Sequence, residues 1–237
     1  MKHTSNIIFV SVVLALAATG CGDMVLTLGQ PTSPAPVGNM DAQFYVNRAK
    51  AELRQNDRAD AYTDLANAIA VNSDCAEAYV IRARMEEGDG NNMAALNDYT
   101  RAIELLPNSA SNYAARGRVK YRMRDFDGAV SDCSMAIQLS PNNAFHLVYR
   151  GMAYLQKGDV VNASMDFRKA VEMPTQEAIS AGAGSLAKRE AHGFLAYIAG
   201  EYREAANSWE GVQALAHSPD LSFWITEANN RWNSASH

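Results

Sequence analysis

Residues 110–143 read ASNYAARGRVKYRMRDFDGAVSDCSMAIQLSPNN, and the same residue types return each time the window moves by 34 positions. An arginine recurs in one register and alanines recur in two others: Arg48, Arg82, Arg116 and Arg150; Ala61, Ala95, Ala129 and Ala163; Ala68, Ala102, Ala136 and Ala170. A repeat of this length indicates stacked helical hairpins, because one hairpin cannot bury its apolar face alone. The sequence therefore predicts an all-α array, a class that binds other proteins far more often than it catalyses reactions.

The composition is that of an ordinary globular protein. The 237-residue chain is 48% apolar, which is enough to build a substantial core. Its formal net charge is −5, and it contains no block of like charges. A protein that binds nucleic acid normally carries a basic patch that contacts phosphates. We therefore predict that nucleic acid is not a partner.

Residues 1–20 have the layout of a signal peptide. An apolar run over residues 7–18 follows Lys2, and it is too short to span a bilayer comfortably. The run continues into Ala-Ala-Thr-Gly-Cys at 17–21, which resembles a bacterial lipobox. The resemblance implies cleavage before Cys21 and acylation of that cysteine. The alternative is a secretory signal that is cut near this point without lipid attachment.

The segment after the cleavage site is predicted to be a flexible, lipid-anchored tether over residues 21–41. It contains three prolines among Ser, Thr and Gly residues: Pro31, Pro34 and Pro36. Such a segment cannot bury enough apolar area to offset the entropy lost on ordering. Gly22, and not Asp, follows the cysteine, so the lipobox resemblance implies an outer-membrane lipoprotein that faces the periplasm. A soluble periplasmic or secreted protein is the alternative.

The helical array is predicted to span residues 42–216, with units that start at 42, 76, 110, 144 and 186. Each unit reads as a helix, a turn and a second helix, with repeat positions numbered 1 to 34 from its start. The turns hold Asn, Gly, Arg or Asp residues: Asn56-Asp57, Gly88-Asp89-Gly90, Arg124-Asp125 and Gly158-Asp159. An insertion at about 175–185 precedes the fifth unit and is either a slack loop or a partner-binding excursion. Residues 217–237 are predicted to form a C-terminal capping helix and tail.

The repeat resembles the tetratricopeptide repeat. The family's signature positions are held by Gly117 and Gly151, Tyr154, Ala129 and Ala163, Ala136 and Ala170, and Pro141. The resemblance implies a right-handed α-solenoid of about five units, whose concave groove binds extended or helical protein segments. With the signal sequence, the chain is similar to the bacterial lipoproteins of this family. These include pilus-assembly lipoproteins and envelope adaptors of peptidoglycan-processing enzymes and proteases.

An aspartate stands sixteen residues after the arginine in each of the first four units: Asp64, Asp98, Asp132 and Asp166. In an antiparallel hairpin, two positions whose repeat numbers add up to a constant value lie at one level, and the arginine and aspartate meet this condition. In the fifth unit both residues change together, to His192 and Ser208. We therefore predict structural Arg–Asp ion pairs inside the hairpins and not a catalytic pair.

The groove is predicted to change character along the array, from basic in units one to three to apolar in units four and five. Its candidate binding residues are Lys50, Arg84, Arg118, Tyr121, Arg122, Met152, Leu155, Phe194 and Tyr197. The basic part should meet carboxylates, from acidic side chains or a free C-terminus, and the apolar part should take hydrophobic anchors.

No signature of catalysis is found. The five histidines show no metal-ligand spacing, and no nucleotide-binding loop or nucleophile elbow occurs. We therefore predict no catalytic residues, no metal and no cofactor. Three classes of function remain, led by a membrane-anchored scaffold or adaptor that binds proteins in the bacterial cell envelope. The alternative is a structural component of a pilus or secretion apparatus that acts through oligomerisation, and the least favoured is an enzyme.

Overall fold

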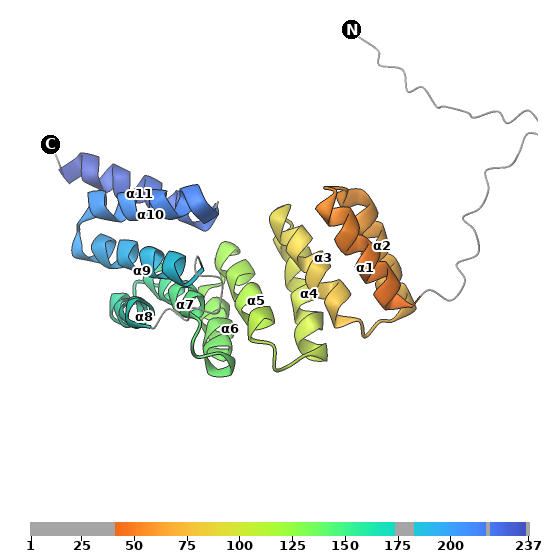
Figure 1. Ribbon diagram of the computed structural model, residues 1–237. Helices are drawn as coiled ribbons and strands as arrows, with labels where there is room; N and C mark the ends of the chain where they lie inside the picture. Colours follow the sequence, from red (N-terminus) through yellow and green to blue (C-terminus); the bar gives the residue numbers. More distant parts are fainter. Residues whose placement is uncertain (1–40, 174–182, 217–218, 236–237) are drawn as a thin grey trace, which may run out of the picture. The chain divides into compact units, whose positions relative to one another are not determined.

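The computed structural model describes residues 41–173, 183–216 and 219–235, and these residues form eleven α-helices and no strand (Figure 1). The helices are α1 (Ala42–Arg54), α2 (Arg58–Val71), α3 (Ala76–Gly88), α4 (Asn92–Leu105), α5 (Ala110–Arg122), α6 (Phe126–Leu139), α7 (Ala144–Gln156), α8 (Val160–Glu172), α9 (Ala183–Ala199), α10 (Tyr202–Ala216) and α11 (Pro219–Ala235). The predicted signal peptide, Cys21, the tether up to residue 40 and most of the predicted insertion lie outside the described residues. The prediction of an all-α fold is confirmed.

Consecutive helices pair into five hairpins: α1 with α2, α3 with α4, α5 with α6, α7 with α8, and α9 with α10. The second helix of each hairpin packs against the first helix of the next, so that the hairpins stack in chain order, as Figure 1 shows. Helix α11 packs against α10 in the same way. The predicted α-solenoid of stacked hairpins is therefore confirmed. Helix α9 begins at Ala183, earlier than the predicted start of its unit at residue 186.

The turn of every hairpin places one residue in the left-handed region, always at repeat position 15. The φ values are 62° at Asn56, 81° at Gly90, 64° at Arg124, 80° at Gly158 and 85° at Gly200. Two backbone hydrogen bonds close each turn, from the N–H groups of this residue and the next to carbonyls of the preceding helix. This is the usual way to end a helix with a residue of positive φ, for which Gly and Asn are preferred. Arg124 is the exception among the five.

Glycine at position 8 makes room for a large side chain on the second helix of the same hairpin. A Cβ added at Gly151 would lie 2.6 Å from the Phe167 ring, and one at Gly193 would lie 2.3 Å from Trp209. Phe167 stacks on Phe194 with ring centroids 4.7 Å apart, and Phe194 in turn meets Trp224 of α11 edge-on at 5.3 Å. The close approach of the backbones therefore permits an aromatic core that runs from α8 to α11.

The predicted Arg–Asp pairs are present in all four units. In three of them both bonds of the fork measure 2.7–2.8 Å: Arg82–Asp98, Arg116–Asp132 and Arg150–Asp166. Arg48 and Asp64 form the fourth pair. The four aspartates are buried, which makes a charged partner obligatory. The prediction of structural ion pairs inside the hairpins is confirmed.

Two of these arginines also tie their hairpin to the preceding one. Arg116 donates from Nη1 to the Thr100 hydroxyl at 3.3 Å, and Arg150 donates to the Ser134 hydroxyl at 3.1 Å. Each hydroxyl belongs to the second helix of the preceding hairpin. A planar guanidinium can hold a carboxylate with one edge and a hydroxyl with the other. In units three and four, the repeated arginine therefore links its hairpin to the preceding one. It also joins the two helices of its own hairpin.

Candidate binding groove

The first helices of the hairpins carry the predicted groove residues, and the structure leaves only some of them accessible. Arg84 is exposed, and Leu155 and Tyr197 are half-buried. Lys50 forms an ion pair of 2.6 Å with Glu77 of the next unit. Because both side chains of that pair are exposed, water screens their attraction. A partner's side chain could therefore replace one of them with little loss of free energy.

The prediction that Met152 and Phe194 serve as hydrophobic anchors in the apolar part of the groove is wrong. Met152 and Phe194 are 2% and 0% exposed, so neither can line an open groove. Phe194 lies between the rings of Phe167 and Trp224, and Met152 belongs to the core where α7 packs against α9. The physical reason is that the first helices of units four and five and α11 pack directly on one another. In unit two the side chain at repeat position 9 is Arg84, and it faces outward. In units four and five the side chain at the same position faces a neighbouring helix.

The arginines at the centre of the predicted basic part are already paired within the chain. Arg118 holds Glu87 through two bonds of 2.5 and 2.7 Å, and Arg122 also reaches Glu87 at 2.9 Å. Arg122 forms a second fork with Asp220 of α11, at 2.7 and 3.0 Å. The hydroxyl of Tyr149 donates to the same aspartate at 3.2 Å. The chain's own carboxylates therefore occupy the two arginines that we had assigned to a partner.

A further carboxyl group lies beside this network. Glu190 of α9 is 6% exposed, and burial raises the pKa of its carboxyl group to about 7. The negative charge of Asp220 adds to the rise. Among the described residues no cation forms an ion pair with Glu190, whereas Asp220 and Glu87 are both paired with Arg122. Glu190 is thus the polar group in this region whose charge state changes near neutral pH.

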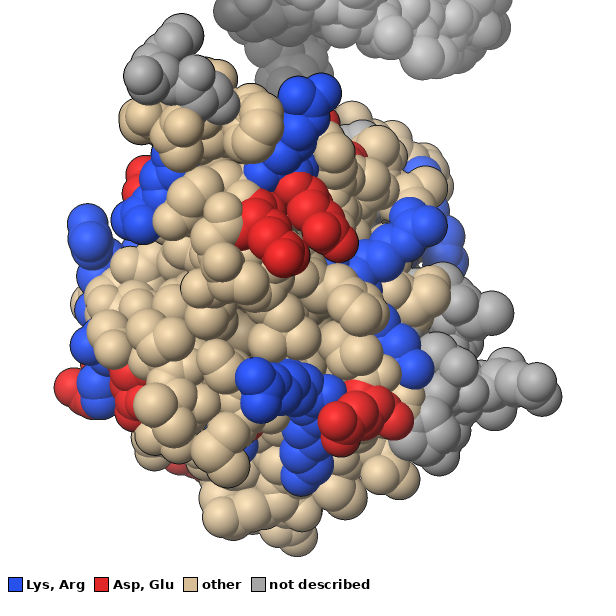
Figure 2. All heavy atoms as spheres, turned by 90° about the vertical axis from the view of Figure 1, so that its left-hand side faces the viewer, with Lys and Arg blue, Asp and Glu red and all other residues tan. Residues whose placement is uncertain are grey.

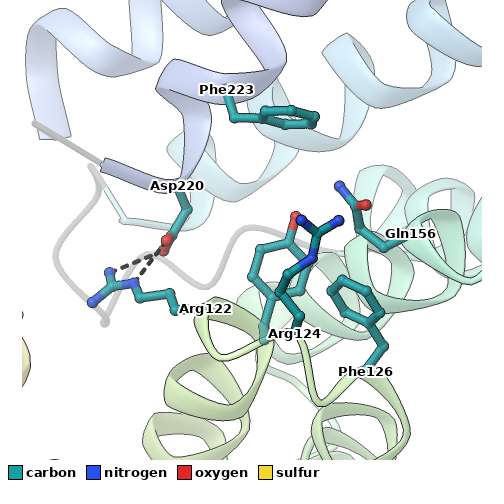
Figure 3. Close-up of a pocket in the computed structure, with 7 residues that line it drawn as sticks. Arg122, Arg124, Phe126, Gln156, Asp220 and Phe223 are labelled. Carbon is teal, nitrogen blue, oxygen red and sulfur yellow. Dashed lines mark hydrogen bonds and ion pairs between the residues drawn. The ribbon is translucent and has the colours of Figure 1, made fainter.

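Two adjacent hollows lie where α11 meets the C-terminal ends of α5, α7 and α9. The first has a volume of about 310 Å³ and is lined by Tyr121, Arg122, Arg124, Phe126, Gln156, Asp220 and Phe223 (Figure 3). The second has a volume of about 380 Å³ and is lined by Leu155, Gln156, Val160, Tyr197, Ile198, Tyr202, Phe223, Trp224, Glu227 and Arg231. Gln156 and Phe223 line both hollows, so the two are adjacent, and we call them together the α11 groove. Predicted residues Tyr121, Arg122, Leu155 and Tyr197 all contribute to it.

The α11 groove exposes apolar side chains that the core does not use. Phe223 is 57% exposed and Val160 is 43% exposed. Tyr121, by contrast, is covered by α11, and its hydroxyl accepts a hydrogen bond of 3.1 Å from the Trp224 indole. The lining of the second hollow also includes the Glu227–Arg231 ion pair, so the groove combines exposed apolar side chains with charged groups.

Arg124 and Phe223 are among the contributors to this groove that sequence reasoning missed. Arg124 had a visible signal, because it takes a place that Gly or Asn holds in the other four units. Phe223 had none, since α11 belongs to no repeat and its contacts join parts of the chain that are distant in sequence.

Surface charge gives no indication of a nucleic-acid interface on the side that Figure 2 shows. Lysine and arginine side chains there are interspersed with aspartate and glutamate, and neutral residues cover most of the surface. In the part of the chain that the structure describes, no helix is both long and apolar enough to cross a bilayer. Within the same residues, no three metal-ligating side chains gather in one place.

Comparison with known proteins agrees with this geometry. Residues 46–110 match the family model described as the tetratricopeptide repeat (TPR). The helical array has the TPR fold. No curated protein sequence matches the chain significantly.

Solved structures of several proteins, two of them described as TPR proteins, are similar in fold. A TPR protein of Thermus thermophilus is 18% identical, with a TM-score of 0.56, and the match covers 79% of this chain and 98% of that one. MamA of Desulfovibrio magneticus RS-1 is 18% identical with a TM-score of 0.59, over 78% and 99% of the two chains. A TPR protein of Parabacteroides merdae is 16% identical with a TM-score of 0.59, over 81% and 73%. At these identities the likeness concerns the TPR fold alone.

Proposed function

We propose that this protein is a membrane-anchored scaffold of the bacterial cell envelope that binds other proteins through its TPR array. TPR arrays generally serve as interaction scaffolds and not as enzymes. The observation that carries the proposal is the α11 groove, which is open to solvent and keeps Phe223 57% exposed. A large aromatic side chain at the edge of a concave apolar hollow is the kind of contact that dominates protein binding energy.

The anchor is proposed from the sequence. The apolar run over residues 7–18 and the small residues before Cys21 support cleavage and lipid attachment at that cysteine. Acyl chains contribute about 0.8 kcal/mol for each CH₂ group buried in the bilayer, so several chains together hold a protein stably. The lipobox resemblance favours a location at the outer membrane, facing the periplasm. Replacement of Cys21 by Ser should abolish labelling by a fatty acid, and an unlabelled wild type would contradict the anchor.

Binding through the groove can be tested by crosslinking in living cells. A photoreactive amino acid at Gln156 or Phe223 should capture a partner, because both side chains line the two hollows. Met165 of α8 is a matched control, since it is 63% exposed and apolar but lines neither hollow. Capture from the control as strong as capture from the groove would contradict the proposal. If the captured protein is a second copy of this chain, the protein acts instead as a self-assembling component.

A further inference from the structure

We propose that the α11 groove selects its partner through an acidic side chain that binds Arg124, next to apolar side chains that fill the hollows. This inference rests on the proposed function and names the chemistry of the segment that the groove accepts. Three independent features of Arg124 carry it: its backbone conformation, the direction of its side chain, and the lack of a carboxylate partner among the described residues.

The backbone of Arg124 is in a conformation that its residue type disfavours. Its φ of 64° lies in the left-handed region, where a residue with a long side chain is less stable than Gly or Asn. The other four turns hold Asn56, Gly90, Gly158 and Gly200 at the same repeat position. The turn itself therefore needs only Gly or Asn, and its backbone hydrogen bonds are the same in all five units. Residues held in such a disfavoured conformation are concentrated at functional sites.

The side chain of Arg124 extends into the groove. Figure 3 shows its guanidinium group reaching up into the first hollow, towards Gln156 and Phe223, with the Phe126 ring beside it. Arg122 lines the same hollow, but its guanidinium is turned towards Asp220. The two arginines therefore differ in role, since one ties α11 to α5 and the other faces the open space.

Arg124 has no carboxylate partner in the part of the chain that the structure describes. Twelve other arginines and lysines form ion pairs within those residues, and Arg122 forms two of them. A guanidinium in a partly apolar hollow, with its fork free, is suited to hold a planar carboxylate through two hydrogen bonds. Arg124 therefore presents an unpaired positive charge to the hollow, which is complementary to an acidic residue.

The rest of the groove fixes the remaining chemistry of the segment. Beyond Gln156 and Phe223, the second hollow offers the apolar side chains of Leu155, Val160 and Ile198, and the Glu227–Arg231 ion pair lines it as well. Both hollows are open to solvent, so a segment bound there need not end inside the groove. We therefore assign the groove to an internal segment in which an acidic residue is followed or preceded by apolar residues. A free C-terminal carboxylate is the competing source of the same charge.

Labelled peptides test this assignment with the full mature chain. An array of peptides of about twelve residues would place two leucines at varied spacings from one position that holds Asp or Asn. A third set would lack the Asp and end in a free carboxylate, and all other peptides would end in an amide. Fluorescence anisotropy should show binding to the wild type about tenfold tighter for the Asp peptide than for its Asn counterpart, the size expected of one charge-assisted contact.

Two variants of Arg124 separate recognition from stability. Arg124→Gly should remove the preference for Asp, and it should raise the melting temperature because the turn then holds its preferred residue. Arg124→Lys keeps the charge and should retain part of the preference. Equal binding of every Asp and Asn pair by the wild type would overturn the inference. So would an unchanged preference in Arg124→Gly, or a preference only for the free C-terminus.

The crosslinking experiment distinguishes failure of this inference from failure of the proposed function. If Gln156 and Phe223 capture a partner equally well in the wild type and in Arg124→Gly, the groove binds protein but Arg124 does not select it. If neither position captures anything, the proposed function itself fails. The expected result is capture by the wild type that falls about tenfold in Arg124→Gly, with the folded fraction of the variant unchanged.

Discussion

Arg122 at the end of α5 and Asp220 at the start of α11 form a two-pronged ion pair of 2.7 and 3.0 Å, although 98 positions separate them in the sequence. The pair is enclosed, because the side chains are 21% and 6% exposed. Arg122 also holds Glu87 of α3, so one guanidinium joins the second and third units to the C-terminal helix. The last helix is thereby fixed to the middle of the array as well as to its neighbour α10.

Replacement of Asp220 by Asn should loosen α11. The substitution removes one charge of a buried pair, and we expect the free energy of unfolding to fall by about 1–3 kcal/mol. The loss should stay below that of a fully orphaned charge, because Arg122 keeps Glu87. Faster amide hydrogen exchange confined to α11 would show that the helix detaches locally.

An exposed pair provides the control for this change. Asp74 forms an ion pair with Arg101 at 3.0 Å, but its side chain is 70% exposed. Asp74→Asn should therefore change the stability far less than Asp220→Asn does. If the two variants lose equal stability, the Arg122–Asp220 pair contributes nothing beyond an ordinary surface contact.

The arginine of the repeat should be coupled to its aspartate. Arg150 and Asp166 are 23% and 7% exposed, so Arg150→Ala leaves a buried carboxylate without its partner and should cost about 3 kcal/mol. A double-mutant cycle of Arg150→Ala with Asp166→Ala should give a coupling energy above about 1 kcal/mol. The exposed pair Arg101–Glu104 should give no comparable coupling, because water screens it. Additive losses at Arg150 and Asp166 would contradict the pairing.

Regular features of the array could be predicted from the sequence because each of them recurs. A single arginine sixteen positions before an aspartate means little. Here four such pairs occur in one register, and both residues change together in the fifth unit. That pattern can be tested against the geometry of a helical hairpin. The turns could be predicted in the same way, because Asn, Gly or Asp recurs in each unit at the point where the helical pattern ends. The pairs and the turns are present in the structure, although Gly88, which was predicted to lie in a turn, is the last residue of α3.

Contacts that occur once could not be predicted. Phe194 holds the same repeat position as the exposed Arg84, but it is buried between Phe167 of α8 and Trp224 of α11. Whether the side chain at a repeat position is buried depends on the angles at which the neighbouring helices pack. The sequence pattern of one unit carries no information about these angles. Likewise, nothing in the sequence joins Asp220 to Arg122, because α11 stands outside the repeat.

Close packing at position 8 leads to a prediction about Gly151. The better helix propensity of alanine alone would raise the free energy of unfolding by roughly 0.5–1 kcal/mol. Its Cβ, however, would lie 2.6 Å from the Phe167 ring, which is fully buried and stacked on Phe194. Displacement of packed core groups costs about 1–3 kcal/mol, so Gly151→Ala should destabilise the array in denaturant unfolding.

Gly88 is the matched control for this substitution. It also lies in a first helix, but a Cβ there would meet nothing within 4 Å. Gly88→Ala should therefore raise the free energy of unfolding by up to about 1 kcal/mol. Stabilisation by both substitutions would mean that Phe167 shifts freely and that the aromatic core is loosely packed.

The stability of the array should fall as the pH rises towards neutrality, because of Glu190. Burial raises the pKa of its carboxyl group from 4.5 to about 7 in the folded chain. Between about pH 4.5 and pH 7 the folded chain therefore binds a proton that the unfolded chain has released, so a rise in pH favours unfolding. Over that range the group should cost roughly 3 kcal/mol of stability, and above it the loss is complete.

Replacement of Glu190 by Gln removes this dependence. Thermal unfolding should show the variant gaining on the wild type as the pH rises from about 5 to about 8, with little difference at the acid end. Glu77→Gln is a control of opposite sign, because a hydrogen bond from Lys50 lowers the pKa of Glu77, whose side chain is half exposed. That variant should lose a little stability at neutral pH and none in acid. A constant difference between Glu190→Gln and the wild type at every pH would show that Glu190 keeps its charge when buried, and that a cation moves to meet it.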